Sequence, residues 1–320
     1  MPDSDLRDAP ILSAHGLGKV YPARKGGAAF VAVDGIDFEV APGECFGFLG
    51  PNGAGKSSTM RMIGCVSPPT SGTLAVLGLD AAHHGATIRS RMGSVPQDDN
   101  LDTELTVREN LLIYARYFRL AKPIARARAD RLLEFARLSD KADERVHALS
   151  GGMRRRLTIA RSLINDPEIL LLDEPTTGLD PQARHLLWER LFQLKRDGVT
   201  LILTTHYMDE AEQLCDRLVI MDRGRIVAEG PPHLLIMEHA TREVLELRFD
   251  PDTQLDAVAA LTPLGSRIEV LPDRLLCYAE DGEAALVAAT QAGLRPVTSL
   301  VRRASLEDVF LRLTGRSLIE

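Results

Sequence analysis

The fold of this chain is decided by the stretch Gly50-Pro51-Asn52-Gly53-Ala54-Gly55-Lys56-Ser57-Ser58. It follows the apolar run 45–49, which predicts a buried strand, and it leads into 59–63, which predicts the start of a helix. Glycines lack a Cβ, so successive backbone N–H groups of such a loop can turn inward around an anion, and the positive end of the helix adds to the field there. Strand, glycine-rich loop and helix in this order predict a phosphate-binding loop rather than a plain turn.

Two side chains of this loop have predicted roles. Lys56 is expected to reach the β- and γ-phosphates of a bound nucleotide, and the Ser57 hydroxyl is expected to bind Mg²⁺. The rest of the stretch, from Gly50 to Gly55 together with Ser58, is expected to contact the nucleotide. The loop therefore predicts a site for a nucleoside triphosphate and its magnesium ion.

Length and composition limit the remaining possibilities. The chain has 320 residues, which suggests two domains, and a formal net charge of −7. That charge argues against a general affinity for nucleic acid or anionic lipid, because both bind basic surfaces. The cysteines are scattered and most lie in apolar contexts, so reduced thiols are expected rather than disulfides or a metal site (Cys45, Cys65, Cys215, Cys277).

The sequence contains no recognisable membrane segment. Residues 1–10 are acidic and polar and are expected to form a disordered leader rather than a signal peptide. No apolar run approaches the roughly 18 residues that a bilayer-spanning helix needs. If the protein works at a membrane, a partner must supply the crossing.

The order of elements predicts an α/β domain followed by a smaller module. Strands are expected at 11–20, 30–33 and 36–40, with a hairpin loop at 23–29. A mostly helical stretch at about 104–150 interrupts the α/β pattern and predicts an inserted subdomain.

Later runs restore the α/β pattern. Residues 169–172 and 200–205 are continuously apolar, as expected for parallel strands covered on both faces. We expect the first domain to cover residues 11–235, with a mixed sheet and an antiparallel β-subdomain. Residues 241–320 predict a small α+β domain with no ligand cluster, which we interpret as a packing or regulatory appendage.

Two carboxylates follow the apolar run 169–172. Asp173 stands at the end of this predicted strand, where it can hold Mg²⁺ directly or through water. Glu174, the next residue, is expected to polarise an attacking water as a catalytic base. A charged strand cap would be the ordinary interpretation, but the phosphate-binding loop upstream favours catalysis.

A second anion site is predicted at Ser150-Gly151-Gly152. Ser150 is expected to cap a helix that starts near Arg154, and the two glycines leave backbone N–H groups exposed. One nucleotide does not need two distant sites in one chain. The arrangement is explained if Ser150 of one protomer faces the γ-phosphate that is held by the loop of another, although a simple capped helix remains an alternative.

Four further residues are weaker candidates. Gln97 ends a predicted strand, where its amide could bind Mg²⁺ or the attacking water, and His206 ends the strand 200–205, where it could contact the γ-phosphate. Tyr21 could stack on adenine or lie at the edge of the core, and Asp180 could lie at the protomer interface. The basic run Arg154–Arg156 is expected to be a solvated face or a protein contact rather than a nucleic-acid site.

Taken together, these motifs resemble the nucleotide-binding subunit of an ABC transporter. Residues 50–58 resemble Walker A and 169–174 resemble Walker B with its catalytic glutamate. Gln97 resembles the Q-loop, 149–153 the signature motif, Gly178-Leu179-Asp180 the D-loop, and His206 the switch histidine. The resemblance covers about residues 11–235, with two departures: Met153 stands where glutamine is commonest and Ser58 where threonine is commonest.

A narrower resemblance covers most of the chain. Residues 95–102, 163–167, 185–190 and 306–315 look like the nodulation ATP-binding proteins of rhizobia. This likeness implies a P-loop ABC ATPase that works as a homodimer on MgATP, at the cytoplasmic face of the inner membrane. It also implies an integral membrane ABC-2-type permease as partner, with membrane contact only through that permease and no nucleic acid as partner. The implied cargo is a lipo-chitooligosaccharide, with drugs or other glycolipids as alternatives.

Two rival functions stay open at this point. A soluble ABC protein that acts on ribosomes or DNA would carry two cassettes or a long coiled coil, whereas this chain has one phosphate-binding loop and no coiled coil. A nucleotide-gated binding module without hydrolysis would lack the catalytic carboxylate, whereas Glu174 and His206 are both present. The sequence therefore favours a transport ATPase.

Overall fold

The computed structural model describes residues 9–22, 28–250 and 254–315. The leader expected at 1–10 and the hairpin loop expected at 23–29 therefore fall mostly outside the described residues. Contacts divide the chain into two compact units, Met1–Glu229 and Gly230–Glu320. The domain ranges expected from the sequence, 11–235 and 241–320, stay a prediction.

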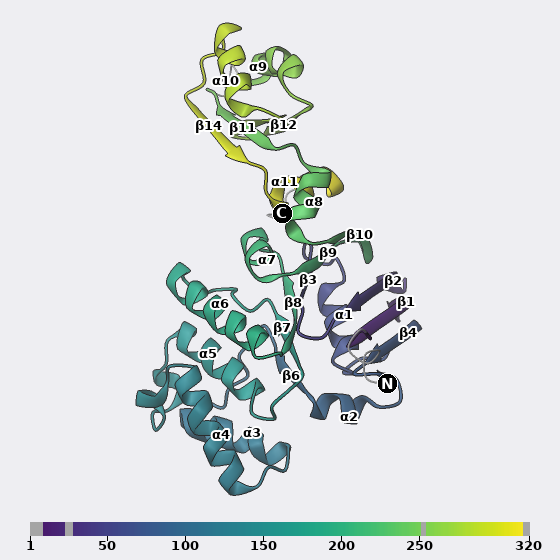
Figure 1. Ribbon diagram of the computed structural model, residues 1–320, viewed down its shortest axis with the longest axis vertical. Helices are drawn as coiled ribbons and strands as arrows, with labels where there is room; N and C mark the ends of the chain where they lie inside the picture. Colours follow the sequence, from purple (N-terminus) through teal and green to yellow (C-terminus); the bar gives the residue numbers. More distant parts are fainter. Residues whose placement is uncertain (1–8, 23–27, 251–253, 316–320) are drawn as a thin grey trace, which may run out of the picture. The chain divides into compact units, whose positions relative to one another are not determined.

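A six-stranded sheet forms the centre of the first unit (Figure 1). Its strand order is β10 (Arg225–Gly230), β9 (Arg217–Asp222), β3 (Cys45–Leu49), β8 (Thr200–Thr205), β7 (Ile169–Asp173) and β6 (Met92–Val95). The strands from β9 to β6 are parallel. Every residue of β3 and β8 is buried, which explains their continuously apolar sequence. Because these strands are parallel, their carboxyl ends lie at one edge of the sheet.

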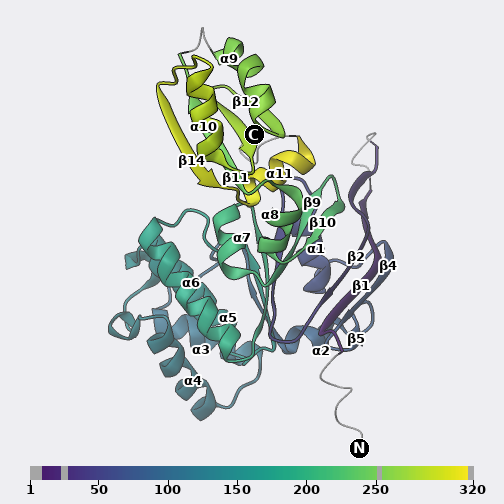
Figure 2. The ribbon, with the colours of Figure 1, turned by 45° about the horizontal axis from the view of Figure 1, so that its top comes forward.

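A second sheet of four antiparallel strands lies beside the first, as Figure 2 shows. It contains β2 (Phe30–Val40), β1 (Leu12–Tyr21), β4 (Ser71–Val76) and β5 (Leu79–Asp80), in that order. Helix α1 (Lys56–Ile63) lies between the two sheets, and its Met60, Met62 and Ile63 share one apolar core with both. The rings of Phe38 and Phe48 bridge the sheets, with centroids 5.1 Å apart.

The helical insert has its own core. It is built from α3 (Val107–Tyr117), α4 (Lys122–Phe135) and two short 3-10 turns, Ser139–Lys141 and Val146–Ala148, packed on α5 (Gly151–Ser162). Thr106 and Glu109 form a capping box that fixes the start of α3. Helix α2 (Gly85–Ser90) precedes these elements, and α6 (Pro181–Arg196) and α7 (Met208–Leu214) follow them. The insert bounds of about 104–150 stay a prediction.

The second unit is a separate α+β fold. Its antiparallel sheet has the order β12 (Arg267–Leu271), β13 (Arg274–Ala279), β11 (Glu243–Arg248) and β14 (Thr298–Arg303). Helices α9 (Gln254–Leu261) and α10 (Gly282–Gln291) cover one face, and α11 (Leu306–Thr314) packs on the other and against α8 (Pro232–His239). The short 3-10 turn Thr262–Leu264 follows α9.

One strand prediction is wrong. The sequence predicted two strands at 30–33 and 36–40, whereas β2 runs without a break from Phe30 to Val40. Gly35 lies inside it with a φ of +66°, and the pairing of β1 with β2 is irregular between Ala14 and Val20. The strand accommodates the extra residues as β-bulges, because a glycine can take a positive φ without ending the hydrogen bonding between the strands.

Candidate functional site

The loop 50–55 joins the end of β3 to the start of α1, as the sequence predicted. Gly53 and Gly55 have φ values of +80° and +108°, a region that side chains disfavour. A Cβ on Gly55 would lie 2.5 Å from the carbonyl oxygen of Ala32, so the loop fits only as glycine. Gly55 is also the N-cap of α1 and gives it no side-chain cap. The first N–H groups of this helix are therefore available to an anion, and the site fits a phosphate group.

Lys56 is held inside the loop. Its Nζ donates to the carbonyl oxygens of Gly50 at 2.6 Å and Pro51 at 3.1 Å, and only 5% of the residue is exposed. Burial lowers the pKa of Lys56, although the carboxylates of Glu174 and Asp173 act in the opposite direction. The ammonium group thus already lies among the atoms that would surround a phosphate, with two carboxylates close enough to affect its charge.

Glu174 is the centre of a polar cluster at the carboxyl edge of the sheet. Gln97 Nε2 donates to Glu174 Oε2 at 3.3 Å, and Thr177 Oγ1 donates to the same oxygen at 3.2 Å. His206 Nδ1 lies 3.2 Å from Glu174 Oε1, within ion-pair distance if the ring is protonated, but without hydrogen-bond geometry. Three residues that the sequence singled out from three different strand ends therefore meet.

The backbone of Glu174 is strained. Its φ of +44° places a non-glycine residue in the left-handed region, which costs about 1–3 kcal/mol and persists only where neighbours impose it. Its N–H donates to the carbonyl oxygen and to the hydroxyl of Thr204, both at 3.1 Å. This geometry turns the Glu174 carboxylate toward Gln97 and His206.

Asp173 has a separate hydrogen-bond partner. The Thr204 hydroxyl donates to Asp173 Oδ1 at 2.5 Å, which leaves Oδ2 without a hydrogen-bond partner in the described part of the chain. Ser57 is exposed beside the loop. A carboxylate, a hydroxyl and the Gln97 amide oxygen are the oxygen donors that Mg²⁺ prefers, so the donor set suits this ion.

The phosphate-binding loop and the Glu174 cluster share one pocket of about 370 Å³. Its lining comprises Phe30, Ala32, residues 51–58, Gln97, Glu174, Thr177 and His206. The pocket can therefore bring a phosphate held by the loop next to a carboxylate that is placed to polarise water.

Sequence reasoning missed Phe30. Its side chain lines the pocket and is 59% exposed, and it pairs across the sheet with Tyr21. Tyr21 itself does not line the pocket among the described residues, and its hydroxyl lies 3.4 Å from Ser58 Oγ. Directly opposed residues point to the same face of a sheet, so both aromatic rings lie on the side of the loop. The cross-strand register that pairs them could not be seen in the sequence.

The signature residues lie apart from this pocket. Ser150 is the N-cap of α5, and its Oγ accepts a bond from the Met153 N–H at 3.3 Å. Asp180 caps α6 by accepting from the Ala183 N–H at 2.9 Å. Of the described residues that line the pocket, none belongs to the signature residues 150–152 or is Asp180.

The basic run Arg154–Arg156 is not uniformly a solvated face, so the expectation needs correction. Arg155 is only 6% exposed, and its guanidinium group donates to backbone carbonyls of two separate loops. Arg154 contacts Asp99 and stays partly exposed. A helix that packs on one side buries every third or fourth residue, and the middle arginine takes that position.

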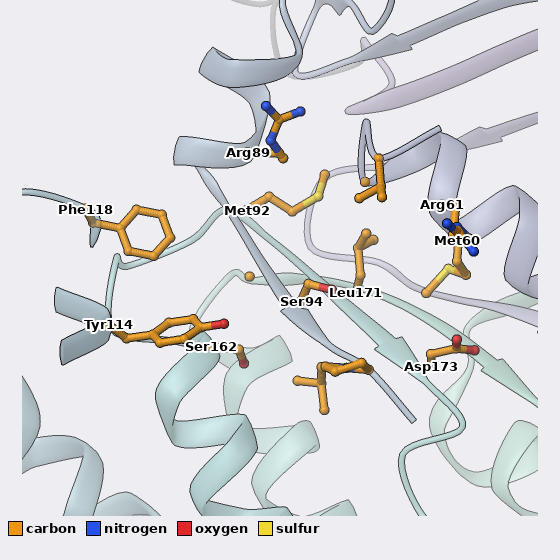
Figure 3. Close-up of a pocket in the computed structure, with 15 residues that line it drawn as sticks. Met60, Arg61, Arg89, Met92, Ser94, Tyr114, Phe118, Ser162, Leu171 and Asp173 are labelled. Carbon is orange, nitrogen blue, oxygen red and sulfur yellow. The ribbon is translucent and has the colours of Figure 1, made fainter. Parts of the chain in front are cut away.

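A second, more apolar pocket of about 320 Å³ lies between α1, β6 and the helical insert (Figure 3). Tyr114 and Phe118 come from the insert, Met60 from α1 and Met92 from β6, and Asp173 stands at one end. The pocket therefore joins the insert to the strand that carries a candidate Mg²⁺ ligand.

The sequence profile described as "ABC transporter" matches residues 33–177. A Nod factor export ATP-binding protein I of Ralstonia nicotianae is 50% identical over 99% of this chain and 98% of its own length. The chain belongs to the ABC transporter family. This ABC ATPase is also 53% identical to the protein of the same name from Rhizobium meliloti, over 89% of this chain and 84% of the relative.

Solved structures agree with the fold of this ABC ATPase. A dimeric ATP-binding cassette in a post-hydrolysis state with ADP and phosphate has a TM-score of 0.63 and 29% identity, and covers 69% of this chain and 98% of its own. The structure described as cbiO1 of Clostridium perfringens, part of the ABC transporter complex cbiONQ, has a TM-score of 0.65 and 29% identity, and the match covers 72% of this chain and 92% of that one. The predicted α/β ATPase fold, ATP hydrolysis and nucleotide binding are thereby confirmed.

No helix in the described part of the chain is long and apolar enough to cross a membrane. The second unit matches the profile described as "Nodulation factor export protein NodI, C-terminal domain" over residues 255–315. That match concerns the small α+β unit, which the sequence predicted without a function.

Proposed function

We propose that this ATPase powers an exporter, and that two copies bind MgATP head to tail. The observation that carries the proposal is the shared pocket in which Lys56 and Glu174 meet. In this proposal Lys56 and the N–H groups of residues 53–58 hold the phosphates, while Glu174 polarises the attacking water. His206 and Gln97 orient the γ-phosphate side of the site.

Ser57, Gln97 and Asp173 would hold the magnesium ion. When bound, Mg²⁺ neutralises charge on the phosphate oxygens. The oxygen donors of these three side chains support this assignment. Because Asp173 is already held by Thr204, its free oxygen is oriented before any ion arrives.

The signature residues would complete the site of a second copy. Ser150, Gly151 and Gly152 lie at the N-terminus of α5, outside the ATP pocket of their own chain, and Asp180 caps the start of α6. The similar cassette that is dimeric with ADP and phosphate supports a dimer of this chain. Dimer formation by the Glu174→Gln variant with ATP, measured by light scattering, tests it; a monomer at saturating ATP would contradict the proposal.

An integral membrane ABC-2-type permease would be the partner, with this subunit peripheral on the cytoplasmic face of the inner membrane. The pocket of Figure 3 supports a docking place, because it is apolar and lies between the insert and the sheet. Motion of the Gln97 loop and the insert would pass through it. Relatives at 50–53% identity are named Nod factor exporters, which supports a lipo-chitooligosaccharide as cargo, with drugs or other glycolipids as alternatives.

The proposed export function is tested by complementation of a strain from which the gene of this ATPase has been deleted. The wild-type gene should restore lipo-chitooligosaccharide to the growth medium, whereas Lys56→Ala should leave it inside the cells. Export that is unaffected by Lys56→Ala would reject the proposal. Co-purification with ribosomes rather than with a membrane protein would favour the soluble alternative instead.

A further inference from the structure

Arg155 uses every N–H of its guanidinium group on backbone carbonyls. Nε donates to Pro175 at 2.7 Å, Nη1 to Pro96 at 2.5 Å and Gln97 at 3.2 Å, and Nη2 to Asp173 at 3.1 Å and Glu174 at 3.2 Å. A guanidinium group has five N–H donors in a fixed planar fork, so all of them are satisfied. Such a saturated and buried fork is specific to arginine.

The five carbonyls belong to two loops that are distant in sequence. One loop, 96–97, follows β6 and carries Gln97, and the other, 173–175, begins with the last residue of β7 and carries Asp173 and Glu174. These are the loops whose side chains meet at the candidate catalytic cluster. Arg155 therefore links the backbones of the two loops, while the hydrogen bond between Gln97 and Glu174 links their side chains.

Arg155 also holds the backbone of Glu174, whose conformation is strained. The left-handed backbone of Glu174 is held at its N–H by Thr204 and at its carbonyl oxygen by Arg155. Without the second bond, the peptide after Glu174 could relax toward an ordinary backbone conformation. The carboxylate would then leave the position where Gln97 and Thr177 contact it.

A lysine could not replace this contact. Its ammonium group is a compact point charge and cannot span carbonyls of two loops in one plane. Burial lowers the pKa of Arg155, and the nearby carboxylates of Glu210, Asp173 and Asp99 act in the opposite direction. The position therefore needs the geometry of the arginine fork as well as its charge.

Arg155 stands on α5, the helix whose first turn is capped by Ser150. A twelve-residue helix moves as a rigid rod, so a change at its N-terminus reaches Arg155 little more than one turn away. We propose that Arg155 is a positioning residue, which makes the placement of Gln97 and Glu174 in one copy depend on the engagement of the α5 N-terminus by the next copy. The coupling of the two copies rests on the proposed head-to-tail dimer.

The test compares Arg155→Lys with Arg156→Lys in the full chain. Arg156 is a matched control, because it is the next residue on α5 and also donates to carbonyls, those of Ala136 and Arg137, but within the insert. The measurements are ATP affinity by equilibrium dialysis, steady-state kcat, and hydrogen exchange of the backbone amides. Arg155→Gln, which keeps two donors without charge, serves if the lysine variant does not fold.

A positioning role predicts that kcat of Arg155→Lys falls at least tenfold while its ATP affinity stays within twofold of wild type. Amides of 96–98 and 173–177 should exchange faster, and those of the rest of the sheet should not. Arg156→Lys should stay within twofold in both kinetic quantities. Unchanged kcat in Arg155→Lys would overturn the proposal, and so would faster exchange throughout the first unit together with lost ATP affinity, because that pattern means a purely structural role.

The proposed function has separate controls in the same experiment. Lys56→Ala should not bind ATP, and Glu174→Gln should bind it without turnover. If either variant behaves as wild type, the assigned ATP site is wrong, whatever Arg155 does. If both behave as expected and Arg155→Lys retains its kcat, only the positioning role is rejected.

Discussion

Gln97 and Glu174 are separated by 77 positions in the sequence, yet the amide of the first donates to the carboxylate of the second over 3.3 Å. The contact joins the ends of two neighbouring parallel strands, β6 and β7. It holds the carboxylate on the side of the phosphate-binding loop.

Glu174→Gln should retain ATP binding and lose turnover. Removal of a general base typically costs 10²- to 10⁴-fold in rate, so we expect kcat to fall by about that factor. Phosphate release measures it. Glu168→Gln is the control, since Glu168 precedes the same strand and pairs with Arg91 at the surface. Turnover within threefold of wild type in the Glu174 variant would remove this residue from its assigned role.

Phe30→Ala should weaken the binding of ATP but not of inorganic triphosphate. A ring that stacks on another aromatic group contributes about 0.5–1.5 kcal/mol, which corresponds to a two- to twelvefold change in Kd. Competition with a fluorescent ATP analogue measures both affinities. Val31→Ala is the control, because Val31 is also exposed but its side chain leaves the strand on the opposite face. Equal effects of the two variants would show that Phe30 does not contact the base.

Gly55→Ala should destabilise the first unit and abolish ATP binding. The new Cβ would meet the Ala32 carbonyl oxygen at 2.5 Å in addition to the cost of a φ of +108°. Gly198→Ala measures the cost of the positive φ alone, because Gly198 has a φ of +90° and an added Cβ there would have nothing within 4 Å. That cost is about 1–2 kcal/mol, or a few degrees in Tm for a unit of this size. A Tm of Gly55→Ala no lower than that of Gly198→Ala would contradict the predicted clash.

Asp308→Asn should destabilise the second unit in a pH-dependent way. Asp308 is 1% exposed, and it accepts from both Nη atoms of Arg302 and from the Tyr278 hydroxyl. Burial by itself would raise the pKa of Asp308, but the bonds and charge of Arg302, with the Ser305 N–H and the Tyr278 hydroxyl, hold it below the ordinary value of 3.8. A buried pair that loses one partner costs several kcal/mol, so we expect about 2 kcal/mol or more for this pair, whose arginine side chain is 27% exposed.

The sign of the pH dependence follows from the lowered pKa of Asp308. A carboxyl that binds protons less readily in the folded state adds stability above its ordinary pKa and loses it as the pH falls through the folded value. The difference between wild type and Asp308→Asn should therefore be complete at pH 7 and shrink below about pH 4. Protection factors of amides 275–279 measure it. Asp281→Asn is the control, since asparagine caps a helix as well as aspartate, and a difference that grows on acidification would contradict the prediction.

Much of the candidate site was predictable because its signals are local. The loop 50–58 carries its own glycines, and Asp173 with Glu174 directly follows an apolar run whose burial on both faces is visible in the sequence. His206 and Gln97 were placed by one rule, that parallel strands end at a common edge. The ABC fold predicted from these motifs is confirmed by the family match.

The residues that were missed depend on contacts between distant segments. Phe30 faces the pocket because of its register with Tyr21 across a hairpin, and that register contains irregularities that no periodicity reveals. Arg155 reads as the middle of a basic run, and only the docking of α5 against two loops buries it. The continuity of β2 through Gly35 was hidden for a related reason, because a bulge interrupts the alternation without interrupting the strand.

Helix α1 is clamped between two sheets, whereas the helical insert has a core of its own. The helix that would hold the nucleotide thus belongs to the core shared by the two sheets, and we expect the insert, with its separate core, to move relative to it. A conformational change driven by ATP hydrolysis would then appear at the insert rather than at α1. A cross-link between the insert and the six-stranded sheet should therefore leave a protein that binds ATP but cannot move its insert.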